Sequence, residues 1–260
     1  KKAINQIKFS KNQNNSNFFE ANLLLALDSF VKKNYKKTSD ILKKIENFQK
    51  RNTYELIIYE TLESYNNLFL FKQLEKKNTN FSKLSLITNA FQNCYLNSNK
   101  TNSHFTNLIN SSEGDYSRYL FFYLGNIIEN KDYDYASKIS LTIKPLKSSL
   151  LISQAKNWID DKKFIKFKDY FSCKNENDLL SEFFFLISNL YSSQEKFEAS
   201  NFYLSISNYL NPKFYFNLSL LVDNHYSENN FELVKQTLKK FKKKDEIYYW
   251  YKIKKIAQIL

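Results

Sequence analysis

Hydrophobic residues recur at intervals of three and four along residues 181–212, which is the spacing of an amphipathic helix. The stripe in the first half of this segment consists of Phe184, Ile187, Leu190 and Tyr191. A polar stretch at 192–196 interrupts the pattern, and a second periodic stretch begins at Phe197. The pattern therefore predicts two helices joined by a short turn, with the stripe packed in the core against Phe197 and Leu204 rather than against a cofactor.

An aromatic residue directly after a polar turn recurs along the chain. Its occurrences are Tyr35, Tyr133, Phe164, Phe197 and Phe231. The last four are separated by 31, 33 and 34 residues, and Tyr35 lies 98 residues before Tyr133, which is about three more periods. A regular spacing of this size is the signature of a repeat architecture. We therefore expect an array of helical hairpins whose units between Tyr54 and Asn110 have drifted.

Glycine and proline are almost absent, since the chain of 260 residues contains two of each. Tight β-hairpins depend on such residues, so a sandwich or barrel is disfavoured. Two isolated glycines, Gly114 and Gly125, also cannot form the glycine-rich loops that hold nucleotide phosphates. The composition therefore favours an all-α protein and gives no sign of a phosphate cradle.

An aromatic that opens the second helix, together with Leu-Asn-Pro at 210–212, resembles the tetratricopeptide repeat. Tyr123-Leu124-Gly125-Asn126 is similar to the leucine-glycine step of the family's first helix, and Ala136 matches its small residue three positions after the turn aromatic. The small residue is replaced by Ser200, Val234 and Phe167 in other units, so we expect looser helix crossing there. The resemblance is closest over 117–260.

The resemblance implies a right-handed α-solenoid of stacked antiparallel helix pairs with about seven degenerate repeats. Residues 1–116 would form degenerate repeats and residues 117–260 clearer ones, within one continuous solenoid. In detail the chain is similar to long tetratricopeptide proteins of A+T-rich bacteria, which implies a soluble protein of the bacterial cytoplasm or periplasm. It also implies a non-catalytic scaffold that binds a partner peptide or helix in the concave groove lined by first helices.

The family's groove positions carry over to eight residues of this chain. They are Lys156, Glu182, Phe185, Asn189, Phe216, Ser219, Asp223 and Tyr226. Asparagine and charged side chains in such a groove would hold a peptide, while aromatic side chains would fill its pockets. Phe185 and Phe216 fit the hydrophobic core equally well, and the sequence leaves these two interpretations open.

The net charge of +13 suggests a second function, a basic helical-repeat protein that binds nucleic acid. Of the 39 basic residues, however, only Arg51 and Arg118 are arginines, and arginine makes the bidentate contacts that specific readers of nucleic acid use. Lysine, asparagine, phenylalanine and tyrosine are also residues that A+T-rich codons supply. We therefore favour a protein partner and keep nucleic acid as the alternative.

No arrangement of residues indicates catalysis, a metal site or a cofactor. His104 and His225 lie in different repeats, and no metal or triad motif includes either of them. Cys94 and Cys173, 79 residues apart, form no redox or zinc motif; we expect buried thiols, with a disulfide left open. The longest strongly apolar stretch, 119–128, is far shorter than the roughly 20 residues of a membrane span.

The last predicted helix carries an apolar stripe on the side where a terminal repeat would normally be polar. The stripe consists of Trp250, Ile253, Ile256, Ala257 and Leu260. We expect from this that the chain is a segment of a longer array, in which a following hairpin covers Trp250.

Overall fold

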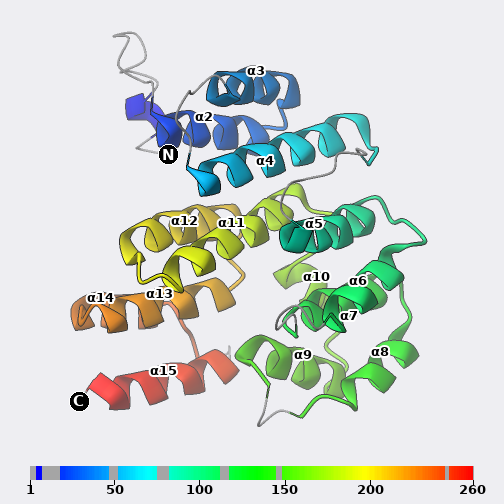
Figure 1. Ribbon diagram of the computed structural model, residues 1–260. Helices are drawn as coiled ribbons and strands as arrows, with labels where there is room; N and C mark the ends of the chain where they lie inside the picture. The colour runs from blue at the N-terminus through cyan, green and yellow to red at the C-terminus, as the bar shows by residue number, and fades with distance from the viewer. Residues whose placement is uncertain are drawn as a thin grey trace. The chain divides into compact units, whose positions relative to one another are not determined.

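The structure is a computed structural model that describes residues 4–7, 18–46, 52–74, 82–111, 117–144, 148–243 and 246–259. All regular secondary structure in these ranges is helical, so the predicted all-α class is confirmed (Figure 1). The helices are α2 (Phe19–Val31), α3 (Tyr35–Glu46), α4 (Thr53–Phe71), α5 (Ser82–Tyr95), α6 (Thr101–Ile109), α7 (Tyr119–Glu129), α8 (Tyr133–Ser140), α9 (Leu150–Asp160), α10 (Ile165–Tyr170), α11 (Glu176–Ser192), α12 (Phe197–Leu210), α13 (Phe216–Ser227), α14 (Phe231–Leu238) and α15 (Glu246–Ile259).

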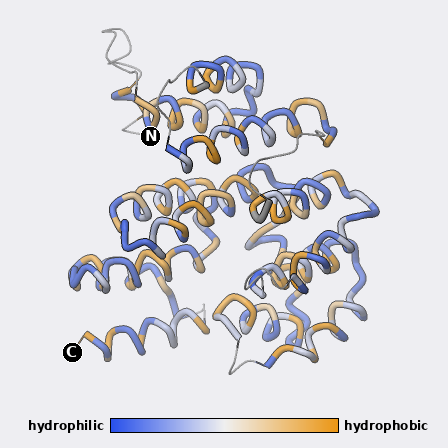
Figure 2. The backbone as a smooth tube through the Cα atoms, in the orientation of Figure 1, coloured by the Kyte–Doolittle hydropathy of each residue, from blue (hydrophilic) through white to orange (hydrophobic). Residues whose placement is uncertain are grey.

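The chain forms two compact units, residues 1–98 and residues 99–260. The first unit contains α2 to α5, and the second contains α6 to α15. Hydrophobic and hydrophilic stretches alternate along the helices of both units (Figure 2), as expected for helices that each bury one side. One continuous solenoid through both units stays a prediction.

The first unit is held together by aromatic rings from successive helices. Phe69 of α4 lies at the centre, with ring centroids 6.1 Å from Phe30, 5.9 Å from Tyr35 and 5.2 Å from Tyr95. The start of α4 is fixed by a capping box, in which Asn52 and Glu55 accept hydrogen bonds from each other's backbone N–H groups. Local capping and long-range ring packing thus support the same helix.

The predicted helix–turn–helix units share one turn geometry. A left-handed residue lies two positions before each turn aromatic, and these residues are Lys33, Lys131, Lys162, Glu195 and Asn229. In the α11–α12 turn, the N–H of Lys196 donates to the carbonyl of Tyr191 and the N–H of Glu195 to that of Ser192, which is a Schellman motif. The polar turns predicted directly before Phe164, Phe197 and Phe231 are confirmed.

Buried hydroxyl and amide groups join α11, α12 and α13 in two layers seven residues apart. The layers are Ser181, Ser207 and Asn217, and Ser188, Ser200 and Asn224. Because residue 181 pairs with 207 and 188 with 200, α11 and α12 run antiparallel. The Ser188 and Ser200 hydroxyl oxygens are 2.8 Å apart, so the two helices are in contact at this layer, and the looser crossing expected at Ser200 stays a prediction.

Phe121 of α7 lies at the centre of the second unit, where it is 1% exposed. Its ring centroid is 5.5 Å from that of Phe167 in α10, 5.9 Å from that of Phe214 and 6.3 Å from that of Trp158 in α9. These contacts join segments that are far apart in the sequence. The aromatic core thereby sets the positions of α9 and α10, which carry part of the candidate site.

Two details of the expected core differ in the structure. Leu190, predicted in the packed stripe of α11, is 38% exposed, while Phe184 and Ile187 are fully buried. Cys94 and Cys173 are buried as expected, but neither is a free thiol, so the expectation of two thiols is wrong.

No helix in the described ranges is both long and apolar enough to cross a membrane.

Candidate functional site

Arg118, directly before α7, organises three of the predicted groove residues. Its Nη2 atom lies 2.8 Å from Oε2 of Glu182 in α11. Its guanidinium carbon lies 4.1 Å from the ring centroid of Phe185 and 4.9 Å from that of Phe216 in α13. A guanidinium group over aromatic faces gains cation–π attraction in addition to the ion pair. The structure thus brings Glu182, Phe185 and Phe216 together around a residue that the sequence did not point to.

This cluster lies in the interior of the second unit. The Glu182 side chain is 1% exposed and the Arg118 side chain 14% exposed, and Phe185 is also buried. Burial raises the pKa of Glu182 to about 7, although the positive charge of Arg118 acts in the opposite direction. A partner could reach Glu182 or Phe185 only after the helices separated. The arrangement is therefore suited to holding α7, α11 and α13 together.

A second cluster joins the predicted residues of α13 to α15. The Tyr251 hydroxyl lies 2.9 Å from Oδ1 of Asp223 and 3.1 Å from the carbonyl oxygen of Ser219, which can both accept its hydrogen bond. Nζ of Lys255 is 2.8 Å from Asp223 and 4.7 Å from the ring centroid of Tyr226. Burial, followed by the negative charge of Asp223, raises the pKa of Tyr251. Ser219, Asp223 and Tyr226 thus hold α15 in place.

Asn189 and Lys156 lie apart from both clusters. The Asn189 side chain is exposed near the end of α11. Lys156 is on α9, where its Nζ lies 3.1 Å from Oδ2 of Asp160 one turn later. Its neighbour on the same helix, Asn157, lines a pocket that the sequence did not predict.

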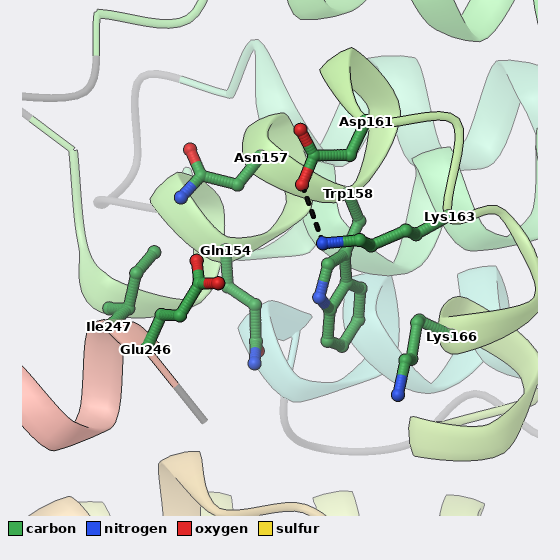
Figure 3. A pocket seen from close by; sticks show the side chains of 8 residues that line it. All are labelled: Gln154, Asn157, Trp158, Asp161, Lys163, Lys166, Glu246 and Ile247. Carbon is green, nitrogen blue, oxygen red and sulfur yellow. Dashed lines mark hydrogen bonds and ion pairs between the residues drawn. The ribbon is translucent and has the colours of Figure 1, made fainter. Parts of the chain in front are cut away.

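This pocket, of about 230 Å³, lies between α9, the start of α10 and the start of α15 (Figure 3). Its lining residues are Gln154, Asn157, Trp158, Asp161, Lys163, Lys166, Glu246 and Ile247. In Figure 3, Glu246 and Ile247 approach from α15 on one side, and Lys163 and Lys166 lie on the other. Lys163 forms an ion pair with Asp161 at 2.7 Å. The pocket therefore presents a carboxylate and an ammonium group at opposite ends.

Gln154 is the unusual residue in this wall. Its side chain is 7% exposed, and its Oε1 atom has no hydrogen-bond partner. Buried polar groups almost always have a partner, because leaving one unpaired costs about 1–3 kcal/mol. The Oε1 atom itself is buried in the wall, so a ligand in the pocket would reach it only if the Gln154 side chain rotated.

The residues that sequence reasoning missed had only weak signals. Arg118 is one of two arginines and directly precedes a strongly apolar stretch. Gln154 interrupts the apolar face formed by Leu151, Ala155 and Ile159. A rare arginine and a polar residue on an apolar face each suggest a buried polar contact, but neither identifies its partner.

No group of histidine, cysteine, aspartate and glutamate side chains in the described part of the chain could hold a metal ion.

We expect the buried carboxyl of Asp178 in α11 to make the stability of the protein depend on pH. The Asp178 carboxylate accepts a hydrogen bond from the backbone N–H of Ser172 at 2.9 Å, but burial raises its pKa to about 7. A carboxyl whose pKa is higher in the folded state stabilises the protein below pH 4, and this contribution is lost as the pH rises to 7. The free energy of unfolding should fall by about 1.4 kcal/mol per pH unit between pH 5 and 7 from this residue.

Asp178→Asn keeps the acceptor for Ser172 and removes the titration. Urea unfolding of both proteins from pH 5 to 8 would show a flatter pH dependence and a more stable variant at pH 8. Equal slopes for the two proteins would contradict this prediction. Glu182 acts with the same sign, so part of the slope should persist in the variant.

Comparison with known proteins gave no match to a family model, a curated protein or a solved structure.

Proposed function

We propose that the chain is a non-catalytic protein–protein interaction scaffold that binds a peptide segment of a partner between the first helices of its hairpins. The repeated Schellman turn supports an array of tetratricopeptide-like hairpins, because the same turn precedes each of the aromatics that define the repeat. In such a solenoid, first helices line the inner wall. In the second unit the first helices are α7, α9, α11, α13 and α15.

The observation that carries this proposal is the pocket lined by the Gln154 side-chain amide, whose Oε1 atom has no partner in the described residues. It lies between two of the proposed first helices, since its walls come largely from α9 and the start of α15. A peptide group offers both an N–H donor and a carbonyl acceptor, and the side-chain amides of Gln154 and Asn157 can match both. At about 230 Å³, the pocket is smaller than the sites that hold drug-sized ligands. Its size therefore favours part of a peptide over a large cofactor.

The charged residues at the two ends of the pocket would select among peptides. Glu246 is exposed on α15, and Lys166 is exposed on α10. A peptide that places a basic side chain near Glu246 and an acidic one near Lys166 would complement both. The aromatic ring of Trp158 forms the wall between them in Figure 3 and offers an apolar surface.

Selection of binders from a displayed random-peptide library tests the proposal, with the native protein and Gln154→Leu as matched targets. Leucine has a similar volume and no polar atom, so we expect the variant to be about 1 kcal/mol more stable, because a buried unpaired group is removed. We expect the native protein to enrich peptides that bind with micromolar affinity. Gln154→Leu should bind these peptides about tenfold more weakly, since a hydrogen bond between neutral groups is lost.

Loss of binding in a variant that is more stable cannot be attributed to unfolding. Failure to enrich any sequence, or equal binding by the two proteins, would refute the proposed site. Preferential capture of single-stranded oligonucleotides, with an affinity that drops steeply as salt is raised, would instead support the nucleic-acid alternative.

A further inference from the structure

Helix α3 carries a basic face on the side that does not pack against the first unit. Thr38, Ile41, Leu42 and Ile45 are buried where α3 contacts α2 and α4 (Figure 1). The exposed residues of the helix are Lys36, Lys37, Asp40, Lys43 and Lys44. This exposed face therefore has four positive charges, one negative charge and no apolar side chain.

The four lysines form two parallel rows. Lys36 and Lys43 are seven residues apart, as are Lys37 and Lys44, and seven residues are two turns or about 10.5 Å along a helix. Asp40 lies between the rows, three or four residues from every lysine. In the described part of the chain, none of these five side chains forms an ion pair. The positive charges of the face therefore have no partner within it.

Lysines elsewhere in the protein are arranged differently. Lys32, Lys156 and Lys235 each form an ion pair with a carboxylate three or four residues away along the chain. Codon usage that favours lysine would raise the number of lysines in all helices alike. It does not explain a helix face on which four lysines gather and none is paired.

We propose that this face of α3 binds the phosphate backbone of a nucleic-acid duplex without reading its sequence. Lysine contacts phosphate as a point charge, whereas base edges are read mainly by arginine, asparagine and glutamine. The face contains none of these three residue types. A duplex carries one negative charge about every 1.7 Å along its axis, so a single helix can meet several phosphates at once.

The composition of the face favours a duplex over other anionic partners. Protein interfaces have an apolar centre, and single strands stack their bases on exposed aromatic rings, but this face offers neither. A helix that binds an anionic membrane inserts apolar side chains into it, whereas the apolar side chains of α3 are buried in the first unit. Lysines alone suffice for a duplex backbone, because binding is driven by the release of counterions.

The salt dependence of binding to a mixed-sequence DNA duplex of about 20 base pairs tests the proposal. Four phosphate contacts predict a Kd of about 10–100 μM at physiological salt and a slope of about 3.6 when log Kd is plotted against log salt. Lys36→Gln/Lys43→Gln and Lys37→Gln/Lys44→Gln each remove one row, so each should lower the slope to about 1.8. Glutamine has nearly the helix propensity of lysine, so the circular dichroism spectrum should not change.

Asp40→Asn should act in the opposite direction. It removes the negative charge between the two rows, so the duplex should bind about threefold more tightly. A gain of affinity cannot result from unfolding. Unchanged or weaker binding by this variant would contradict the proposed position of the phosphates.

A matched variant separates this face from the net charge of +13. Lys138→Gln/Lys196→Gln also removes two exposed lysines, but carboxylates lie near both, since Lys138 follows Asp134 by four residues and Lys196 lies between Glu195 and Glu198. This variant should keep the native slope. An equal loss of slope in the matched variant and in the α3 variants, or tighter binding to a single strand of the same length, would overturn the proposal.

Vesicles that contain phosphatidylserine form the last arm of the experiment. The native protein should bind them only at low salt, because a few lysines at a membrane surface are readily screened. Stronger binding to vesicles than to the duplex would overturn the proposal. Gln154→Leu should leave duplex binding unchanged, and the lysine variants should leave peptide capture unchanged, so duplex binding and peptide binding can fail separately.

Discussion

Arg118→Leu should destabilise the second unit by about 3–5 kcal/mol at pH 8, because it leaves the Glu182 carboxylate buried without its partner. The Nη2–Oε2 contact of 2.8 Å is the only hydrogen bond or ion pair of the Glu182 side chain within the described residues, and its Oε1 atom already lacks one. The variant also removes the guanidinium from the faces of Phe185 and Phe216. Urea unfolding of the native and variant proteins measures the difference.

The pH dependence and a double variant identify the mechanism of this loss. At pH 5 the cost should be smaller, because the Glu182 carboxyl, whose pKa is raised to about 7, is then neutral. Arg118→Leu/Glu182→Leu should recover most of the stability or exceed that of the native protein, since apolar side chains can replace a buried ion pair. Equal losses in the single and double variants would show that packing, not the unpaired charge, causes the effect.

Arg118 also shows what the sequence could not reveal. Its partner Glu182 is 64 residues away, which is about two repeat periods, but a repeat period does not show which side chains of different units meet. Hydrophobic spacing reports which residues share the face of one helix, but not which face of another helix they meet. Gln154 and the α9–α15 pocket were missed for the same reason, since they depend on α15 approaching α9.

The turns, in contrast, could be predicted because their signals are local. A polar stretch ends one helix, a left-handed residue reverses the chain, and an aromatic two positions later lies at the start of the next helix or directly before it. These features lie within about six residues and need no information from elsewhere in the fold. The helical class followed in the same way from the scarcity of glycine and proline.

The groove residues on α11 show where a family pattern stops being informative. In the tetratricopeptide pattern, α11 would have one face open to the groove. In the structure, however, Phe183, Phe184 and Phe185 are all buried. Three consecutive aromatics cannot lie on one stripe, so the helix is enclosed on several sides. This run of three phenylalanines is visible in the sequence. It favours a place in the hydrophobic core for Phe185 over a place in the groove.

Phe121→Ala should cost about 3–5 kcal/mol, the range measured when a buried ring is removed from a core. The ring is 1% exposed and contacts five other aromatic rings, from Phe122, Trp158, Phe167, Tyr170 and Phe214. Because these rings come from α7, α9, α10 and the segment before α13, they cannot all close the cavity without shifting helices. Leu141→Ala, at a side chain 78% exposed, is the matched control and should change stability by less than about 0.5 kcal/mol.

The same variant tests whether the aromatic core positions the pocket. Trp158 contacts Phe121 at 6.3 Å between ring centroids and also lines the pocket. If the core holds Trp158 in place, Phe121→Ala should shift the fluorescence of Trp158 to longer wavelength, as measured in a Trp250→Phe background that removes the other tryptophan. Phe121→Leu fills part of the cavity and should cost about half as much. An unchanged spectrum in a destabilised Phe121→Ala protein would mean that the pocket wall does not depend on this ring.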